Sequence, residues 1–191
     1  MPPRIKTTTE DIINAAYEIV RKEGMKKLTA RNVAQSLGTS VQPIFRAFVN
    51  MEDLEEVVME KIKDTYREYI MSSVSVDDAL MGTVMAYIRF AREEKNLFQI
   101  LHMSDRYAFQ NTKEISDVDI NVEIVKVIAQ MEHMTTEEAA FLYQATFFTA
   151  HGIASLIATN HCEFTDEEIK VMLDKVFHGT AMKMKSEREE K

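Results

Sequence analysis

The chain has 191 residues, 46% of them hydrophobic and 28% charged, which suits one ordinary domain or one domain with a small module attached; its five Gly and three Pro exclude a collagen-like or long proline-rich disordered chain. The single cysteine, Cys162, cannot form an internal disulfide bond, which suits a reducing cytoplasm. The net charge of −8 is uneven: the first 50 residues hold eight Lys and Arg against four Asp and Glu (+4), whereas residues 51–191 hold 15 against 27 (−12), so we expect only the N-terminal end to meet a polyanion.

Apolar residues recur at helical spacing along the whole chain, without the period-two alternation that a β-sheet requires. A Thr followed three residues later by a Glu is typical of a helix start, because each side chain satisfies the other residue's free backbone amide. Such pairs occur at Thr7/Glu10, Thr135/Glu138 and Thr165/Glu168. We therefore predict an all-α fold.

Three short helices are predicted in the first 50 residues, over about residues 8–23, 30–37 and 40–47. Gly24 is placed to end the first helix in a left-handed conformation, Thr29 is a good N-cap for the second, and Gly38 breaks the second. The third helix is expected to bury Ile44 and Phe48.

The helical pattern continues after residue 50. Asn50 is predicted to cap a long helix with Leu54, Val57 and Ile62 facing inward, and a Ser-rich break follows at residues 72–75. The remaining predicted elements are a helix over about 76–94, a short helix capped by Asn96, a loop at 104–117, a helix containing Ile120, Ile124, Val127, Ile128 and Met131, a helix at 136–160 and a last helix at 166–185.

One segment is long enough to span a membrane, because residues 139–162 contain no Asp, Glu, Lys or Arg. The segment also contains polar residues that lipid tolerates poorly, among them Gln144, His151, Asn160 and His161. We interpret it as the buried helix of a soluble bundle and expect no membrane partner, with a membrane-associated protein as the alternative.

The second and third predicted helices are joined by the tight turn Leu37-Gly38-Thr39-Ser40. This is the helix-turn-helix pattern, in which the helix after the turn enters the major groove of DNA. The positively charged end of the chain is therefore also the end with a DNA-reading pattern.

The run from Ala15 to Leu54 includes Gly24, Leu28-Thr29-Ala30-Arg31, Leu37-Gly38-Thr39-Ser40 and Asn50-Met51-Glu52-Asp53-Leu54, and it resembles the TetR family of bacterial transcriptional repressors. The segment Ala150–Leu156 is also similar to one found in a subgroup of TetR-like C-terminal domains. The resemblance implies a three-helix helix-turn-helix DNA-binding domain at residues 1–50. A long fourth helix would link it to a helical ligand-binding and dimerisation bundle within residues 51–191, about nine helices in all.

By this resemblance the protein is a homodimeric repressor that binds a near-palindromic double-stranded DNA operator and is released by a small apolar or amphipathic effector. The predicted DNA-binding residues are Arg4, Lys6, Thr29, Arg31, Ser40, Val41, Gln42, Pro43, Phe45 and Arg46. Arg31 stands in the first turn of a helix, where a cation opposes the helix dipole and favours a nearby anion. Gln42 has the shape to pair with adenine, and Val41 or Pro43 can contact a thymine methyl group.

Three positions depart from the family pattern. Where relatives often have Tyr, His and Lys in contact with phosphates, this chain has Phe45, Ala47 and Met51. Fewer phosphate contacts predict a shallower salt dependence of DNA binding. The departure also leaves open an alternative, a helical ligand-binding or adapter protein that no longer binds DNA.

The C-terminal part is less specific. Effector-binding candidates are the aromatic, Met and His residues of its middle helices: Tyr87, Phe90, His102, Met103, Tyr107, Phe147 and His151. Dimer candidates are a small-residue stripe with the last helix: Ala150, Ala154, Ala158, Ile169, Leu173, Val176 and Phe177. For both sets, packing within the chain's own core is the alternative. The sequence has no HExxH, CxxC, phosphate loop or nucleophile elbow, so we expect neither an enzyme nor a metal or cofactor.

Overall fold

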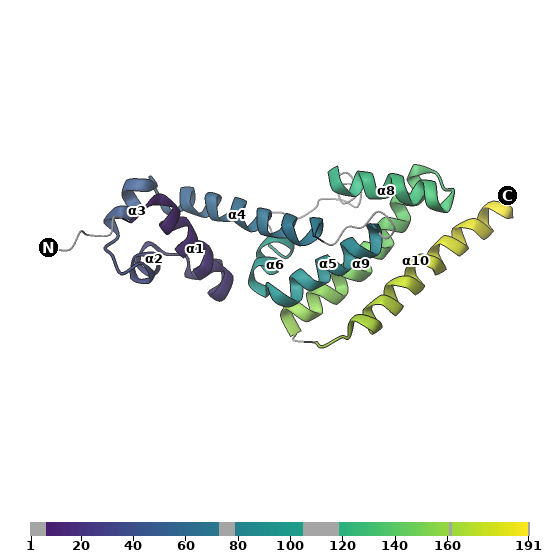
Figure 1. Ribbon diagram of the computed structural model, residues 1–191. Helices are drawn as coiled ribbons and strands as arrows, with labels where there is room; N and C mark the ends of the chain where they lie inside the picture. The colour runs from purple at the N-terminus through teal and green to yellow at the C-terminus, as the bar shows by residue number, and fades with distance from the viewer. Residues whose placement is uncertain (1–6, 73–78, 105–118, 161, 191) are drawn as a thin grey trace. The chain divides into compact units, whose positions relative to one another are not determined.

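The computed structural model describes residues 7–72, 79–104, 119–160 and 162–190 (Figure 1). All regular structure in these ranges is helical, as the sequence predicts. The helices are α1 (Thr9–Glu23), the short 3-10 helix η1 (Met25–Lys27), α2 (Ala30–Ser36), α3 (Gln42–Ala47), α4 (Met51–Met71), α5 (Ala79–Glu93), α6 (Lys95–His102), α8 (Asp119–Glu132), α9 (Thr136–Asn160) and α10 (Asp166–Glu189).

The chain divides into two compact units. The first consists of Met1–Glu68 and Glu94–Ser104, and the second of Tyr69–Glu93 and Asp105–Lys191. This division differs from the predicted boundary at residue 50. Most of α4 and all of α6 belong with the N-terminal helices, because α1 contacts both: the Tyr17 hydroxyl lies 2.9 Å from Thr65 Oγ1 of α4, and α6 packs against α1.

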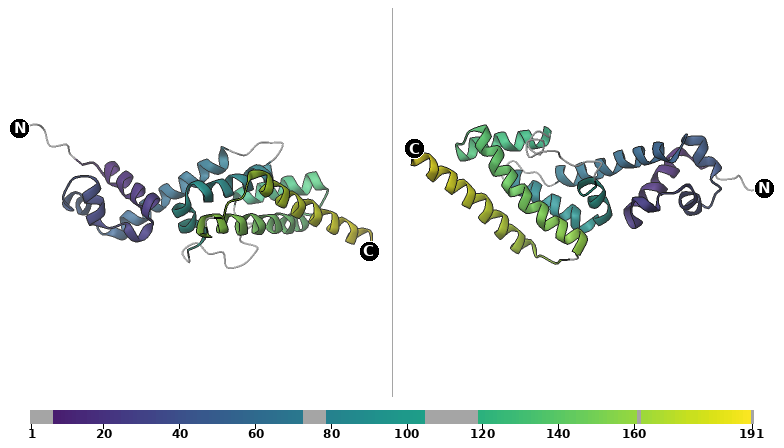
Figure 2. Two further views of the ribbon diagram at one scale, coloured as in Figure 1. Left: turned by 90° about the horizontal axis from the view of Figure 1, so that it is seen from below. Right: turned by 180° about the vertical axis from the view of Figure 1, so that it is seen from behind.

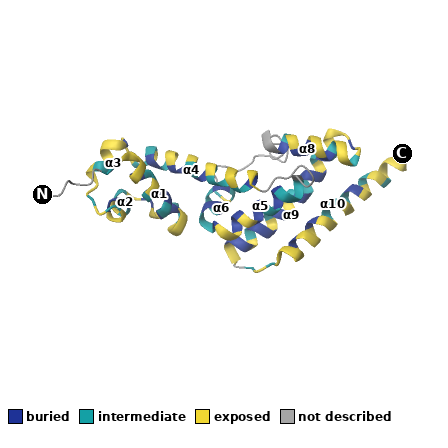
Figure 3. Cartoon of the chain, in the orientation of Figure 1, coloured by how far each residue is buried: buried dark blue, intermediate teal, exposed yellow. Residues whose placement is uncertain are grey.

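The core of the first unit is built from the inward faces of its helices, shown in dark blue in Figure 3. It includes Ile12 and Val20 of α1, Val33 of α2, Ile44 of α3 and Leu54 of α4, all fully buried. The prediction that Val57 faces inward is wrong, since this side chain is exposed on α4. Burial of these apolar faces holds the short helices α2 and α3 in place, because isolated helices of this length are not stable in water.

Three predicted helix caps are confirmed. Asn50 Oδ1 accepts a hydrogen bond from Asp53 N at 2.8 Å, and the boxes Thr135/Glu138 and Thr165/Glu168 both form. The box predicted at the start of α1 is shifted by one residue. Thr8 takes the extended conformation of an N-cap and pairs with Asp11, so Thr7 and Glu10 do not form it.

Asn96 does not cap α6. The residue before that helix is Glu94, and the Asn96 amide instead donates to the carbonyl oxygen of Arg21 at 2.9 Å. A tertiary contact with the end of α1 has replaced the local contact that the sequence predicts, because Asn side chains satisfy whichever backbone group lies within reach.

The second unit is built around α9, which packs against α5, α8 and α10 (Figure 2). By length and composition α9 could cross a membrane. One face of the helix is nevertheless filled with residues buried by its neighbours, including Ala139, Leu142, Tyr143 and Thr146. This is the pattern of a core helix in a helical bundle.

Polar contacts join the C-terminal end of α10 to the residues around the α8–α9 turn. Arg188 forms an ion pair with Glu138 and donates to the carbonyl oxygen of His133 at 3.1 Å, and Lys185 pairs with Glu132 at 2.7 Å. The hydrogen bond from Arg188 lowers the pKa of the Glu138 carboxyl. The helix therefore continues to Glu189, four residues further than predicted.

Candidate nucleic-acid interface

The helix-turn-helix prediction is confirmed at the level of the backbone. After α2, Gly38 takes a positive φ of +63°, and Thr39 N donates to the Ala34 carbonyl at 3.0 Å to close the turn. A positive φ favours glycine because a Cβ clashes there. The chain then enters α3 at Gln42, two residues later than predicted, with Val41 as its N-cap.

One side of α3 is anchored and the other is free. Ile44 and Phe48 are buried in the first unit, as predicted. Ser40, Val41, Gln42, Phe45 and Arg46 are exposed, and Pro43 is half-buried at the helix start. The five exposed residues are therefore available for contact with a partner.

The surroundings of α3 are basic. The segment from Gly24 to Met51 contains no Asp or Glu, but it contains Lys26, Lys27, Arg31 and Arg46. Arg31 and Arg46 are exposed and have no ion-pair partner among the described residues. Thr29 caps α2 by accepting from Asn32 N at 3.2 Å, which accounts for its presence without a ligand.

An open groove of about 1180 Å³ runs between the start of α1 and α3. Its polar lining comes from Thr7 and Thr9 on one side and from Thr39, Ser40, Gln42 and Arg46 on the other. Hydroxyl, amide and guanidinium donors of this kind suit phosphate or base-edge oxygens. Arg4 and Lys6, predicted to contact DNA, lie outside the described residues.

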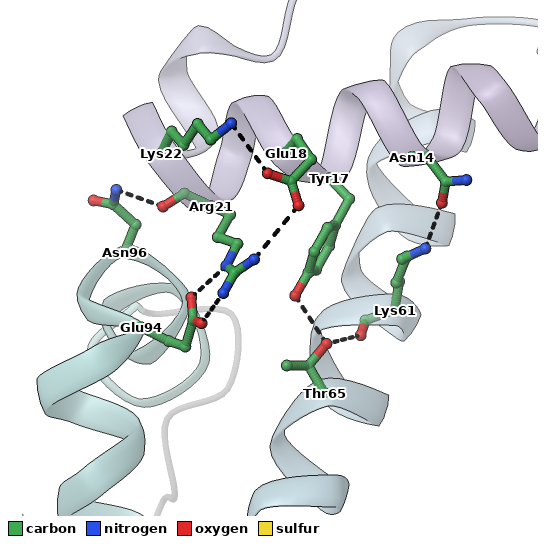
Figure 4. Close-up of polar contacts among 9 residues, drawn as sticks. All are labelled: Asn14, Tyr17, Glu18, Arg21, Lys22, Lys61, Thr65, Glu94 and Asn96. Carbon is green, nitrogen blue, oxygen red and sulfur yellow. Dashed lines mark hydrogen bonds and ion pairs between the residues drawn. The ribbon is translucent and has the colours of Figure 1, made fainter.

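A polar network ties α1 to α6 within the same unit (Figure 4). Arg21 binds the Glu94 carboxylate through two nitrogens, with Nε 2.7 Å from Oε2. The Glu94 side chain is 5% exposed, and Arg21 also lies 3.6 Å from Glu18. The bond to Glu94 raises the pKa of the Arg21 guanidinium. No sequence pattern indicates this pair, since its members are 73 residues apart.

Three of the predicted effector residues gather in the second unit. The Tyr87 hydroxyl lies 2.7 Å from His151 Nδ1, and the Phe147 ring lies 5.4 Å from that of Tyr87 and 6.1 Å from that of His151. Burial lowers the pKa of His151. Phe90 is buried against the Tyr69 ring.

The other predicted effector residues do not join this cluster. His102 and Met103 belong to the first unit, where the His102 ring meets Tyr66 edge-on at 4.9 Å. Burial raises the pKa of the Tyr66 hydroxyl. Tyr107 lies outside the described residues.

A hollow in the second unit was not indicated by the sequence. It measures about 440 Å³ between α5 and α10, and its lining includes Met81, Met85, Arg89, Arg92, Asp166 and Lys170. Arg92 bridges the two helices by pairing with Asp166 at 2.9 Å. Among the described residues, no group of three or more His, Cys, Asp or Glu is placed to hold a metal ion.

The stripe predicted as a dimer interface packs inside the second unit instead. Ala150, Ala154, Ala158, Ile169 and Leu173 are all buried there, and Val176 and Phe177 are half-buried. Small residues at helical spacing allow any helix to approach closely. Here the helices that pack against α9 include α5 and α10 of the same chain, whereas the prediction placed a second copy there. The exposed apolar residues of α9 and α10 are Phe141, Phe148, Leu156, Val171, Met172 and Met182.

An exposed helix that follows a tight turn within a basic stretch of the chain is the arrangement of a helix-turn-helix transcriptional regulator. Residues 12–58 match the model for "Bacterial regulatory proteins, tetR family". The N-terminal segment of the chain is therefore a DNA-binding domain of the TetR type.

The wider comparisons agree with this assignment. The chain is similar to nucleoid occlusion factors SlmA, with 26% identity over 107 residues to that of Actinobacillus pleuropneumoniae serotype 5b and 24% to that of Haemophilus ducreyi. Each match covers 53% of both chains, so it spans about half the length of these curated relatives. A TetR-like transcriptional regulator from Rhodococcus shares the fold, with a TM-score of 0.60 and 11% identity over 93% of this chain and 96% of that one.

Proposed function

We propose that the protein is a cytoplasmic, homodimeric repressor that binds a near-palindromic operator and is released by a small apolar or amphipathic effector. The observation that carries this proposal is α3, a helix anchored by Ile44 and Phe48 whose opposite face presents Gln42 and Arg46 to solvent. Each protomer would place α3 in one half-site, and the half-sites would lie about 34–36 Å apart or a multiple of this.

The outer faces of α9 and α10 support a homodimer. Phe141, Phe148 and Leu156 form an exposed apolar stripe on α9 with Gly152 between them, and α10 exposes Val171 and Met182. Outside the glycine's own helical turn, a Cβ added at Gly152 or Gly179 would meet no atom of the described residues within 4 Å. A glycine in the middle of a helix lowers helix stability by about 1 kcal/mol relative to alanine. Close approach of a second copy of the chain would explain why glycine stands at both positions.

The Tyr87–His151 pair supports an effector site beside Phe147, since a buried hydroxyl and a half-buried imidazole among aromatic rings can orient an apolar ligand with one polar group. Tyr87 lies on α5, which ends at Glu93, and the next residue, Glu94, binds Arg21 of α1. An effector that shifts α5 would therefore pull directly on the residue that holds α1. DNA and effector would then oppose each other through one reciprocal coupling free energy.

The decisive experiment is selection of DNA fragments from a random library at low salt, followed by affinity measurements on the Arg46→Ala variant. We expect one discrete near-palindromic site and a loss of about 1–3 kcal/mol in the variant, with relaxed sequence preference. Arg67→Ala is the matched control, because Arg67 is an exposed arginine on α4 already paired with Asp64.

Two results would contradict this proposal. Equal affinity and preference in the Arg46→Ala variant would remove α3 as the reading helix. Recovery of no discrete site would favour the alternative, a helical ligand-binding or adapter protein that has lost DNA binding. The observation behind that alternative is the absence of the phosphate-binding side chains that Phe45, Ala47 and Met51 replace.

A further inference from the structure

The exposed face of α3 contains an apolar row that the fold does not require. Val41 is 39% exposed and Phe45 is 50% exposed. Val41 has a helical backbone conformation, and Phe45 N donates to the Val41 carbonyl at 3.3 Å. The two side chains are therefore stacked one helical turn apart on the same face.

The unit already has its apolar anchors for this helix. Ile44 and Phe48 are buried in the core, whereas Val41 and Phe45 remain partly exposed. Gln42 and Arg46, each one position further along, form a parallel row of hydrogen-bond donors on the same side of the helix. The reading face therefore consists of one apolar row beside one polar row.

Base edges in the major groove offer a single apolar group, the C5 methyl of thymine. An apolar row on a helix that enters the groove can thus discriminate among base pairs only through this methyl group. We propose that Val41 and Phe45 read thymine methyl groups, so that each operator half-site needs at least one thymine beside the base that Gln42 contacts. This inference rests on the proposed DNA-binding function and specifies what the same helix recognises.

A protein partner is the other class that an exposed apolar pair could serve. The setting favours DNA, because the pair is flanked by Gln42 and Arg46 within a stretch, Gly24 to Met51, that has four cations and no acid. Phe45 also lacks the hydroxyl that a tyrosine would offer to a phosphate, which leaves its ring for an apolar contact.

The test replaces thymine by deoxyuridine, which removes the methyl group and leaves base pairing unchanged. Binding of the full chain is measured to its selected site and to copies with one substituted position in each half-site. Burial of one methyl group is worth about 0.8 kcal/mol, or roughly a 4-fold change in affinity, so substitution in both half-sites should weaken binding by about 16-fold at a contacted position. Deoxyuridine placed at thymines outside the DNA segment that the protein covers serves as the DNA control.

Protein variants assign the effect to residues. Val41→Ala and Phe45→Ala should bind the thymine site more weakly and should lose most of the difference between thymine and deoxyuridine. Val127→Ala is the matched control, because Val127 is a valine of similar exposure (37%) on α8 in the other unit. Both substituted side chains are partly exposed and are not among the buried residues of the core, so the variants are expected to fold, and circular dichroism verifies this.

The outcomes are distinct. A methyl effect that disappears in the Val41 or Phe45 variant supports the inference. A discrete site that tolerates deoxyuridine everywhere, or a methyl effect that survives in both variants, overturns it while leaving the repressor proposal intact. Failure to select any discrete site overturns the repressor proposal and this inference together.

Discussion

Arg21, near the end of α1, and Glu94, immediately before α6, form a two-point ion pair across the first unit, with Arg21 Nε 2.7 Å from Glu94 Oε2. The carboxylate is 5% exposed, whereas the guanidinium is 43% exposed. The pair links α1 to a segment that lies 73 residues further along the chain.

Glu94→Gln should destabilise the protein by removing the charge that Arg21 faces. Breaking a fully buried ion pair costs about 3–5 kcal/mol, and because Arg21 keeps contact with water we expect about 1–2 kcal/mol here. The measurement is the free energy of unfolding in urea. Glu18→Gln is the control, since Glu18 meets the same arginine at 3.6 Å in an exposed position and should cost less than about 0.5 kcal/mol. Equal losses in the two variants would mean that burial gives Glu94 no special role.

Phe45→Tyr should add the phosphate contact that the resemblance to the TetR family implies at this position. The exposed ring position allows an added hydroxyl, which can donate to a DNA phosphate. We expect the Phe45→Tyr variant to bind DNA more tightly at low salt without a steeper salt dependence, because a neutral hydroxyl releases no counterion. Ala47→Lys adds a cation, so it should steepen the slope of log K against log salt by about 0.9 per protomer. Titrations at several salt concentrations distinguish the two. If the wild-type protein already showed a salt dependence as steep as that of a strongly basic repressor, the expectation of few phosphate contacts would be wrong.

Gly152→Ala should separate chain stability from dimerisation. The added Cβ has no neighbour within 4 Å in the chain, so the helix itself should gain up to about 1 kcal/mol. If a second copy packs on this face, the same Cβ enters the interface and the dimer weakens, and Gly152→Leu should weaken it further. Sedimentation at several protein concentrations reports the dimer, and thermal unfolding reports the stability. An unchanged dimer in the Gly152→Leu variant would place the interface elsewhere.

His151 predicts a pH dependence of stability. Burial lowers its pKa below the ordinary value of 6.5, so the unfolded chain takes up a proton at a higher pH than the folded chain does. The stabilisation is therefore fully present above pH 6.5 and is lost as the pH falls through the lower, folded pKa. His151→Gln should remove this component from melting curves recorded between pH 5 and pH 8. His178→Gln, at an exposed histidine of α10, is the control and should keep it.

Local patterns accounted for most of the helices and their caps. Ile44 and Phe48 were placed in the core by spacing alone, and Thr29 and Asn50 cap the helices that follow them. One error occurred where two neighbouring residues offered the same cap. Thr7 and Thr8 are neighbours, and each is followed three residues later by an acidic residue, so a capping box could form at either. In the structure Thr8 is the N-cap of α1 and forms the box with Asp11.

The fold class, the turn before α3 and the family of the N-terminal domain follow from the amino-acid sequence alone, because they depend on helical periodicity, on a glycine at positive φ and on residues close together in the chain. Which helix faces are already occupied depends instead on the packing of helices that are distant in the chain. Ala150, Ala154 and Ala158 are packed inside the second unit, whereas Phe141 and Phe148 are exposed, although each set by its spacing defines a face of the same helix. The Arg21–Glu94 pair likewise required the fold, because periodicity defines a helix face but cannot name the distant residue that meets it.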